Sequence, residues 1–229
     1  MIRARVILPR VRAVLFDFDG TLAYRTRGMW SATLLAALDE VCPGHGVTRD
    51  DLRRGMNDRY PWSTPDVGHS HADADAWWAA IAPMLSGACV GAGIAPEAAE
   101  RAATTFRTLY LDPACWTVYD DVAPALALLD GWRHVIVSNH VPELPDLVAA
   151  LGLPFDLVVT SAAVGWEKPN PRIYAAALAL AGEPDVAWMV GDNPVADVAG
   201  AEAAGLRAVL VRTDGAPGLV EAAEHILRA

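Results

Sequence analysis

Residues 13–22 read Ala-Val-Leu-Phe-Asp-Phe-Asp-Gly-Thr-Leu, and this stretch decides the fold of the chain. An uninterrupted apolar run ends at Asp17, and Gly20 then breaks the pattern. A short apolar run that ends at a turn signal predicts a strand buried on both faces. Asp17 and Asp19 stand at alternate positions where the chain leaves this strand, so both carboxylates project to the same side. The sequence therefore predicts a buried strand over residues 13–17 that delivers two carboxylates to one edge of a sheet.

Later stretches repeat the apolar pattern and alternate with segments of helical periodicity. The further strands are expected at His134–Ser138, Asp156–Thr160, Val186–Gly191 and Arg207–Val211. The helices between and after them are expected near residues 121–130, 143–151, 171–181, 195–204 and 218–227. Strands that alternate with helices in this way are typical of an α/β fold built on a parallel sheet.

Residues 23–115 lack this alternation and read as helices throughout. The expected helices are Met29–Val41, Thr48–Tyr60, Asp73–Leu85 and Pro96–Tyr110. An all-helical block between the first and second strands predicts an insertion over the carboxyl edge of the sheet, where such folds bind ligands. We therefore expect an α/β core made of residues 1–22 and 116–229, and an inserted helical domain of residues 23–115.

The composition excludes several classes of function. The chain has 229 residues, a formal charge of −10 and 53% hydrophobic residues, so it can bury a real core and is not a disordered chain. The acidic balance argues against nucleic acid or an anionic membrane as a partner, because both bind basic surfaces. No apolar run approaches the roughly 18 residues of a membrane span, and no signal-peptide core is recognisable. Three widely spaced cysteines fit neither a disulfide framework nor a zinc site, so we expect a cytoplasmic protein.

Polar residues mark the ends of the later strands as well. Ser138 and Asn139 end the second strand, and Lys168 follows the third in a chain that otherwise uses 17 arginines as its basic side chains. Gly-Asp-Asn ends the fourth strand at Asp192, with Asp197 five residues further on. The ends of parallel strands meet at one edge of a sheet, so these groups are expected to share one site with the two carboxylates of the first strand.

The chemistry of this set points to phosphoryl transfer. Carboxylates crowded into one cleft raise one another's pKa values, and a hard divalent cation relieves that repulsion. Mg²⁺ fits a few carboxylates together with water and phosphate oxygens. The Ser, Thr, Asn and Lys side chains supply hydrogen bonds and one compact positive charge for an anion. Positioning and charge neutralisation of this kind do most of the work in phosphoryl transfer.

The motifs and their order are similar to those of the haloacid dehalogenase-like (HAD) superfamily. They are Asp-Phe-Asp-Gly-Thr, a strand-terminal Ser, a Lys followed by Pro, and Gly-Asp-Asn with a further Asp. The resemblance covers the α/β core, and the helical insertion stands where this family carries a helical cap. It implies a Rossmann-like parallel sheet with the strand of residues 13–17 at its centre, an order that the sequence alone does not show.

The resemblance also implies a role for each matching residue. Asp17 resembles the nucleophile that forms an aspartyl-phosphate, and Asp19 resembles the general acid and base. Mg²⁺ is expected on the carboxylates of Asp17 and Asp192 and on the main-chain carbonyl of Asp19, while Asp197 would support the metal or orient Lys168. The residues that would hold the phosphate and neutralise its charge are Thr21, Ser138, Asn139 and Lys168.

We therefore expect a Mg²⁺-dependent phosphatase that hydrolyses a small phosphomonoester, with a small phosphorylated metabolite as its partner. The main alternative is a 2-haloacid dehalogenase reaction, which needs no proton for halide departure, so an acid at Asp19 favours phosphate esters. A phosphomutase shares every core residue and stays open as an alternative. Phosphonate cleavage through a lysine of the cap is excluded, because the cap has no lysine. The complete acid, base and metal set makes a non-catalytic binding protein the weakest alternative.

Some residues outside the motifs carry weaker signals. His69 and His71 form an H-x-H pair, but no third metal ligand follows at a recognisable spacing, so a plain loop is the simpler interpretation. His140 extends the second motif and is a candidate for substrate contact. Arg25 and Arg27 follow the first motif and would either meet a second anionic group or form a solvated basic turn.

The inserted domain is expected to move relative to the core and close over the substrate. The connecting segments Ala23–Gly28 and Asp112–Thr117 would act as hinges. The pattern assigns three tryptophans to packing rather than to ligand contact. They are Trp77 and Trp78 in the insertion and Trp132 in the core.

Overall fold

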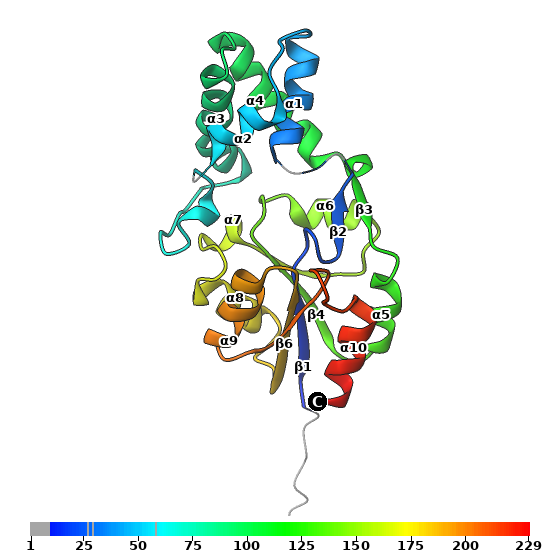
Figure 1. Cartoon of the computed structure of the whole chain (residues 1–229). Helices are drawn as coiled ribbons and strands as arrows, with labels where there is room; N and C mark the ends of the chain where they lie inside the picture. The colour runs from blue at the N-terminus through cyan, green and yellow to red at the C-terminus, as the bar shows by residue number, and fades with distance from the viewer. Residues whose placement is uncertain (1–9, 27, 29, 58) are drawn as a thin grey trace, which may run out of the picture.

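A computed structural model describes the chain at residues 10–26, 28, 30–57 and 59–229. Its centre is a parallel sheet of five strands in the order β5-β4-β1-β6-β7 (Figure 1). The strands are β1 (Arg12–Phe16), β4 (Arg133–Ser138), β5 (Leu157–Thr160), β6 (Val186–Gly191) and β7 (Arg207–Leu210). The α/β fold with a Rossmann-like parallel sheet is confirmed, and β1 lies at the centre, as the family resemblance implied.

Both faces of the sheet are buried, which explains the continuous apolar run in β1. Ala13 and Leu15 pack in one hydrophobic cluster with Ile173 and Tyr174, which belong to helix α8. The alternate residues of β1 pack in a second cluster with side chains of helices α5 and α10. Successive side chains of a strand point to opposite faces, so the part of β1 that is covered on both sides, after the exposed Arg12, is apolar throughout.

Helices cover the sheet on its two sides (Figure 1). The helices of the core are α5 (Val122–Leu128), α6 (Leu144–Ala150), α7 (Ser161–Val164), α8 (Pro171–Leu180), α9 (Gly200–Ala203) and α10 (Leu219–Arg228). The expected helix over residues 195–204 is divided, because a π-helical turn at Pro194–Ala199 precedes α9. In the part of the chain that the structure describes, no helix has both the length and the apolarity to cross a membrane.

The chain between β1 and α5 is mostly helical, and its helices stand over the carboxyl edge of the sheet (Figure 1). Its elements are α1 (Trp30–Val41), α2 (Arg49–Met56), the 3₁₀ turns Pro61–Ser63 and Pro113–Cys115, α3 (Ala74–Gly91) and α4 (Pro96–Leu111). Thr48 caps α2 in a capping box with Asp51. The α2 helix ends four residues before the expected end at Tyr60. The α3 helix continues past Pro83, because the residues after the proline remain buried against the other helices; these are Met84, Leu85, Ala88 and Cys89.

Two short strands connect the helical segment to the core, and the sequence analysis missed both. β2 (Ala23–Arg25) pairs antiparallel with β3 (Trp116–Val118), with Tyr24 opposite Thr117. The chain leaves the core through β2 and returns through β3, so its two crossings are hydrogen-bonded to each other. Three-residue strands carry too little pattern to be recognised in a sequence.

Candidate active site

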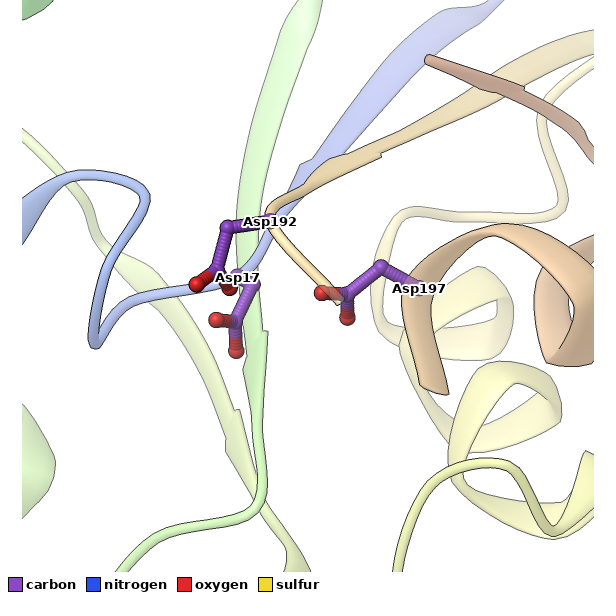
Figure 2. A group of neighbouring side chains, drawn as sticks. All are labelled: Asp17, Asp192 and Asp197. Carbon is purple, nitrogen blue, oxygen red and sulfur yellow. The ribbon is translucent and has the colours of Figure 1, made fainter. Parts of the chain in front are cut away.

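Three carboxylates from separate elements converge at the carboxyl edge of the sheet. Asp17 follows β1, Asp192 follows the neighbouring strand β6, and Asp197 lies on the π-helical turn after β6. Figure 2 shows the three side chains directed toward a common space. One carboxylate oxygen from each lies within 4.8 Å of the others. Within residues 10–26, 28, 30–57 and 59–229, this is the one group of three or more His, Cys, Asp or Glu side chains placed to hold a metal ion.

Lys168 lies between two of these carboxylates. Its Nζ atom is 2.7 Å from Oδ1 of Asp17 and 2.5 Å from Oδ1 of Asp197. Burial by itself would lower the pKa of the Lys168 amine, but the two carboxylates outweigh burial and raise that pKa above its ordinary value. The amine therefore stays charged and places a compact cation beside Asp17.

Asn139 fixes the main chain of Lys168. Its side-chain oxygen accepts a hydrogen bond from the Lys168 amide at 2.6 Å, and its side-chain nitrogen donates to the Lys168 carbonyl at 3.0 Å. Both polar atoms of the Asn139 side chain are thus hydrogen-bonded to the main chain of Lys168. The expected role of Asn139 was to bind phosphate, and the structure adds the role of holding Lys168 in place.

The expected phosphate-binding residues differ in their position. Ser138, Asn139 and Lys168 line the same cavity as the carboxylates. Thr21 does not line it, because its side chain is fully buried and its hydroxyl has no hydrogen-bond partner among the described residues. The main-chain carbonyl of Thr21 accepts a hydrogen bond from Nε of Arg212 at 2.7 Å. The expected role of Thr21 in binding phosphate stays a prediction.

The carboxylates carry more negative charge than the site neutralises. Burial raises the pKa of Asp192 to about 7, and the neighbouring charges of Asp17 and Asp197 add to this. Burial also raises the pKa of Asp197 to about 6, although Lys168 opposes the shift. A divalent cation bound to these oxygens would lower the pKa values again, because it stabilises the ionised carboxylates.

Asp19 lies beside the cluster in a different environment. Burial raises its pKa to about 6, and the guanidinium of Arg25, with Nη2 at 3.8 Å from Oδ2 of Asp19, opposes this shift. A carboxyl with a pKa near 6 can be protonated at neutral pH often enough to donate a proton in a reaction. Its environment therefore suits Asp19 to acid and base chemistry.

Arg25 is not part of a solvated basic turn. Its guanidinium lies over the ring of Tyr110 at 3.5 Å and over the ring of Trp116 at 4.6 Å, and the side chain is buried. Arg25 does not line the cavity in front of the carboxylates, although its guanidinium faces Asp19. Arg27, the other arginine of this stretch, lies outside the described residues.

The cavity has a volume of about 280 Å³ and combines a polar floor with an aromatic roof. The floor consists of the residues at the strand ends. The roof consists of Trp30, Trp62 and Tyr110, all from the helical segment. Sequence analysis did not single out these three residues, because aromatic side chains at irregular spacing look like ordinary core residues.

The histidines that the sequence singled out lie outside this cavity. His140 is buried against Phe18, Tyr110 and Trp116, and burial lowers its pKa to about 3, with the charge of Arg25 adding to the effect. It is therefore a neutral packing residue. His69 and His71 do not form a metal-binding group of three in the described part of the chain, and Nε2 of His69 is 3.2 Å from Oε1 of Glu167 instead.

Comparison with known proteins places the chain in a family. The model of the haloacid dehalogenase-like hydrolases matches residues 11–205, so the chain belongs to that family of enzymes. It is 37% identical to the haloacid dehalogenase-like hydrolase domain-containing protein 3 of Homo sapiens over 184 residues, which are 73% of this chain and 70% of the human protein. It is 35% identical to a phosphoserine phosphatase of Thermus thermophilus over 170 residues, which are 66% of this chain and 68% of that protein.

Solved structures share the fold, and one of them is a dehalogenase. A 2-haloacid dehalogenase from Pseudomonas syringae superposes with a TM-score of 0.64 at 24% identity, over 95% of this chain and 99% of that one. Because the fold carries both phosphate-ester and haloacid chemistry, the choice between them depends on the residues of the site.

Proposed function

We propose that this protein is a Mg²⁺-dependent phosphatase that hydrolyses a small phosphomonoester through an aspartyl-phosphate intermediate. The observation that carries the proposal is the half-buried carboxyl of Asp19, which lines the same cavity as Asp17 and whose pKa is raised to about 6. An alkoxide leaving group needs a proton donor at this place, whereas a halide does not. Named phosphatases among the similar sequences support the same choice.

In this mechanism the chain's own residues carry two steps. A carboxylate oxygen of Asp17 attacks phosphorus and forms a new P–O bond, while the bond to the leaving oxygen breaks and Asp19 transfers its proton to that oxygen. Asp19, now ionised, takes a proton from a water molecule that attacks the phosphorus of the aspartyl-phosphate. The P–O bond to Asp17 then breaks, which releases phosphate and restores both carboxyl groups.

Lys168 serves both steps without moving. Its amine lies 2.7 Å from Asp17, so it stands next to the oxygens of a phosphoryl group bound to that residue. Asp197 and Asn139 hold the lysine from two directions. A fixed positive charge of this kind stabilises the charge of the transferring phosphoryl group with little reorganisation.

The donor set fits Mg²⁺, because it offers oxygen ligands only and because burial and like charges raise the pKa of Asp192. Asp17 and Asp192 would hold the ion through their carboxylates, and Asp19 through its main-chain carbonyl. When bound, the ion would neutralise charge on the phosphoryl oxygens and on the carboxylate cluster.

The cavity has room for a small substrate. A volume of about 280 Å³ is at the low end for ligand sites and fits a phosphate with a small leaving group. We assign the aromatic roof to a mobile cap of residues 23–115, which would close over a small phosphorylated metabolite in the cytoplasm and exclude water from the site. The core would then comprise residues 1–22 and 116–229.

The test begins with hydrolysis of a chromogenic aryl phosphate by the purified protein, with Mg²⁺ and with a chelator. We expect turnover that depends on the ion, and release of phosphate. A panel of sugar phosphates, nucleotides, phosphoglycolate and phosphoamino acids would then identify the leaving group. Halide release from 2-chloropropionate without Mg²⁺, in the absence of any phosphate hydrolysis, would overturn the proposal in favour of the dehalogenase.

A further inference from the structure

A loop of the helical segment contacts the core far from the β2–β3 connection, in addition to the contacts of Trp78 and Arg107 with Glu143. This loop, residues 64–73, is called the cap loop, and the core segment of residues 165–168 is called the lysine segment because it ends at Lys168. The main-chain amide of His69 donates a hydrogen bond to the carbonyl of Gly165 at 2.9 Å. Nε2 of His69 lies 3.2 Å from Oε1 of Glu167. A carboxylate can only accept, so the imidazole donates in this bond.

The backbones of the two segments fit closely. Gly165 has φ of +78°, and a Cβ atom at this position would lie 2.0 Å from the carbonyl oxygen of His69. The ring of Trp166 lies against the backbone of Gly68, and the guanidinium of Arg172 stacks on the same ring with its carbon 3.9 Å from the centroid. Only a glycine at position 165 permits this approach, so the sequence is adapted to a docked cap loop.

Glu167 depends on the cap loop for its hydrogen bond. Its side chain is 1% exposed, and its second oxygen, Oε2, has no partner among the described residues. A buried carboxylate is costly unless it is paired. The described residues give Glu167 one side-chain partner, His69, and that partner belongs to the cap loop. If the cap loop withdraws, Glu167 loses its partner and is driven toward water.

The same movement would displace Lys168, which directly follows Glu167. Asn139 holds the lysine main chain from the core side, while His69 holds the preceding residue from the cap side. We infer that His69 and Glu167 are positioning residues: docking of the cap loop on Glu167 sets the lysine segment so that the amine of Lys168 lies between Asp17 and Asp197. The consequence for catalysis rests on the proposed function, but the contact itself does not.

The contact is tested by hydrogen exchange on the full-length protein with Mg²⁺. In His69→Ala we expect amide exchange in residues 165–168 to increase at least fivefold. In His69→Gln the amide still donates, so exchange should return to within twofold of the wild type. The matched control is Val67→Ala, which trims an exposed side chain of the same cap loop and should leave this segment unchanged. Unchanged exchange in a folded His69→Ala protein would overturn the inference.

A rescue experiment separates positioning from a general loss of stability. In His69→Ala the carboxylate of Glu167 is left buried without a partner, and we expect kcat for an aryl phosphate to fall about tenfold, which corresponds to ~1.4 kcal/mol. Adding Glu167→Gln removes the unpaired charge, so the double variant should recover at least threefold over His69→Ala. If the two substitutions instead multiply their losses, the positioning role is refuted. If the wild type hydrolyses no phosphate ester, the proposed function fails, while the exchange experiment still decides the contact.

Discussion

Replacement of Lys168 tests the electrostatic design of the site. The amine makes two charge-assisted hydrogen bonds, at 2.7 Å to Asp17 and 2.5 Å to Asp197, and it is almost completely buried. Lys168→Met keeps the length and apolar character of the side chain but removes the cation. Lys168→Arg keeps the charge but replaces a compact ammonium with a broad planar group that the gap between the two carboxylates does not accommodate.

The magnitude follows from the number of contacts that are lost. A hydrogen bond to a charged group contributes about 1.5–3 kcal/mol, and removal of one donor to a transition-state oxyanion costs about 10²–10³ in kcat. For Lys168→Met we therefore expect a loss of about 10²–10³ in kcat/KM, or ~3–4 kcal/mol. For Lys168→Arg we expect at least a tenfold loss, or ~1.4 kcal/mol.

The assay is steady-state hydrolysis of an aryl phosphate over a titration of Mg²⁺. The half-saturating Mg²⁺ concentration should not rise in Lys168→Met, because the variant loses a positive charge next to the carboxylates of the metal site. Arg207→Met is the matched control, since it removes a cation at the opposite end of the sheet, where Arg207 begins β7. A Lys168→Met protein with activity within threefold of the wild type would refute the reasoning.

Further predictions concern pH, the metal site and the cap. The raised pKa values of Asp19, Asp192 and Asp197 make these carboxyls bind more protons in the folded metal-free protein than in the unfolded chain, and from about pH 5 to pH 7 they outweigh the opposite effect of His140, so the Tm should fall as pH rises through this window. Calorimetry in the presence of a chelator, at both ends of this pH window, measures the change in Tm. A Tm that rises with pH would contradict the prediction. Asp192→Asn should raise the half-saturating Mg²⁺ concentration at least about tenfold through loss of one charged ligand, and equal Mg²⁺ titration curves would exclude Asp192 as a ligand. Small-angle scattering should show a smaller radius of gyration when Mg²⁺ and orthovanadate are added, with bending at Ala23–Gly28 and Asp112–Thr117, and identical curves would count against cap movement.

The fold could be predicted because its pattern is local. The apolar run in β1 is continuous since Ala13 and Leu15 face one helical layer while Val14 and Phe16 face the other. The order of the strands was available only through the family resemblance, because strand order depends on pairings between segments far apart in the chain. The π-helical turn at Pro194–Ala199 divides the helix that was expected over residues 195–204. The sequence did not indicate this division, since both helix types use the same residues.

The candidate site was predictable where residues follow strand ends and hidden where it depends on long-range contacts. Asp17, Lys168 and Asp192 share the carboxyl edge, as their positions after the strands required. Glu167 and His69 are 98 residues apart, and nothing in either segment indicates that they meet. Arg25 resembles a solvated turn residue in the sequence, and its burial results from the rings of Tyr110 and Trp116, which lie far along the chain.

The identity of the covalent intermediate is the most direct test of the proposed mechanism. Asp19→Asn keeps the nucleophile and the main-chain carbonyl of residue 19, so it should slow both steps by the ~10²–10⁴ typical of lost acid–base catalysis, and slow them less for aryl than for alkyl esters. Rapid quench of this variant with an aryl phosphate, followed by mass spectrometry, should find a phosphoryl group on Asp17, and Asp17→Asn should show none.

Single-turnover reactions of the wild type in heavy-oxygen water complete this measurement. Water that attacks phosphorus places the heavy oxygen in the released phosphate and leaves the Asp17 carboxylate unlabelled. Water that attacks the carboxyl carbon, as hydrolysis of a haloacid-derived ester requires, places it in Asp17. A phosphoryl adduct on Asp17 with label only in phosphate is the result that we predict. Label in the Asp17 carboxylate, or an adduct on any other residue, would contradict the mechanism.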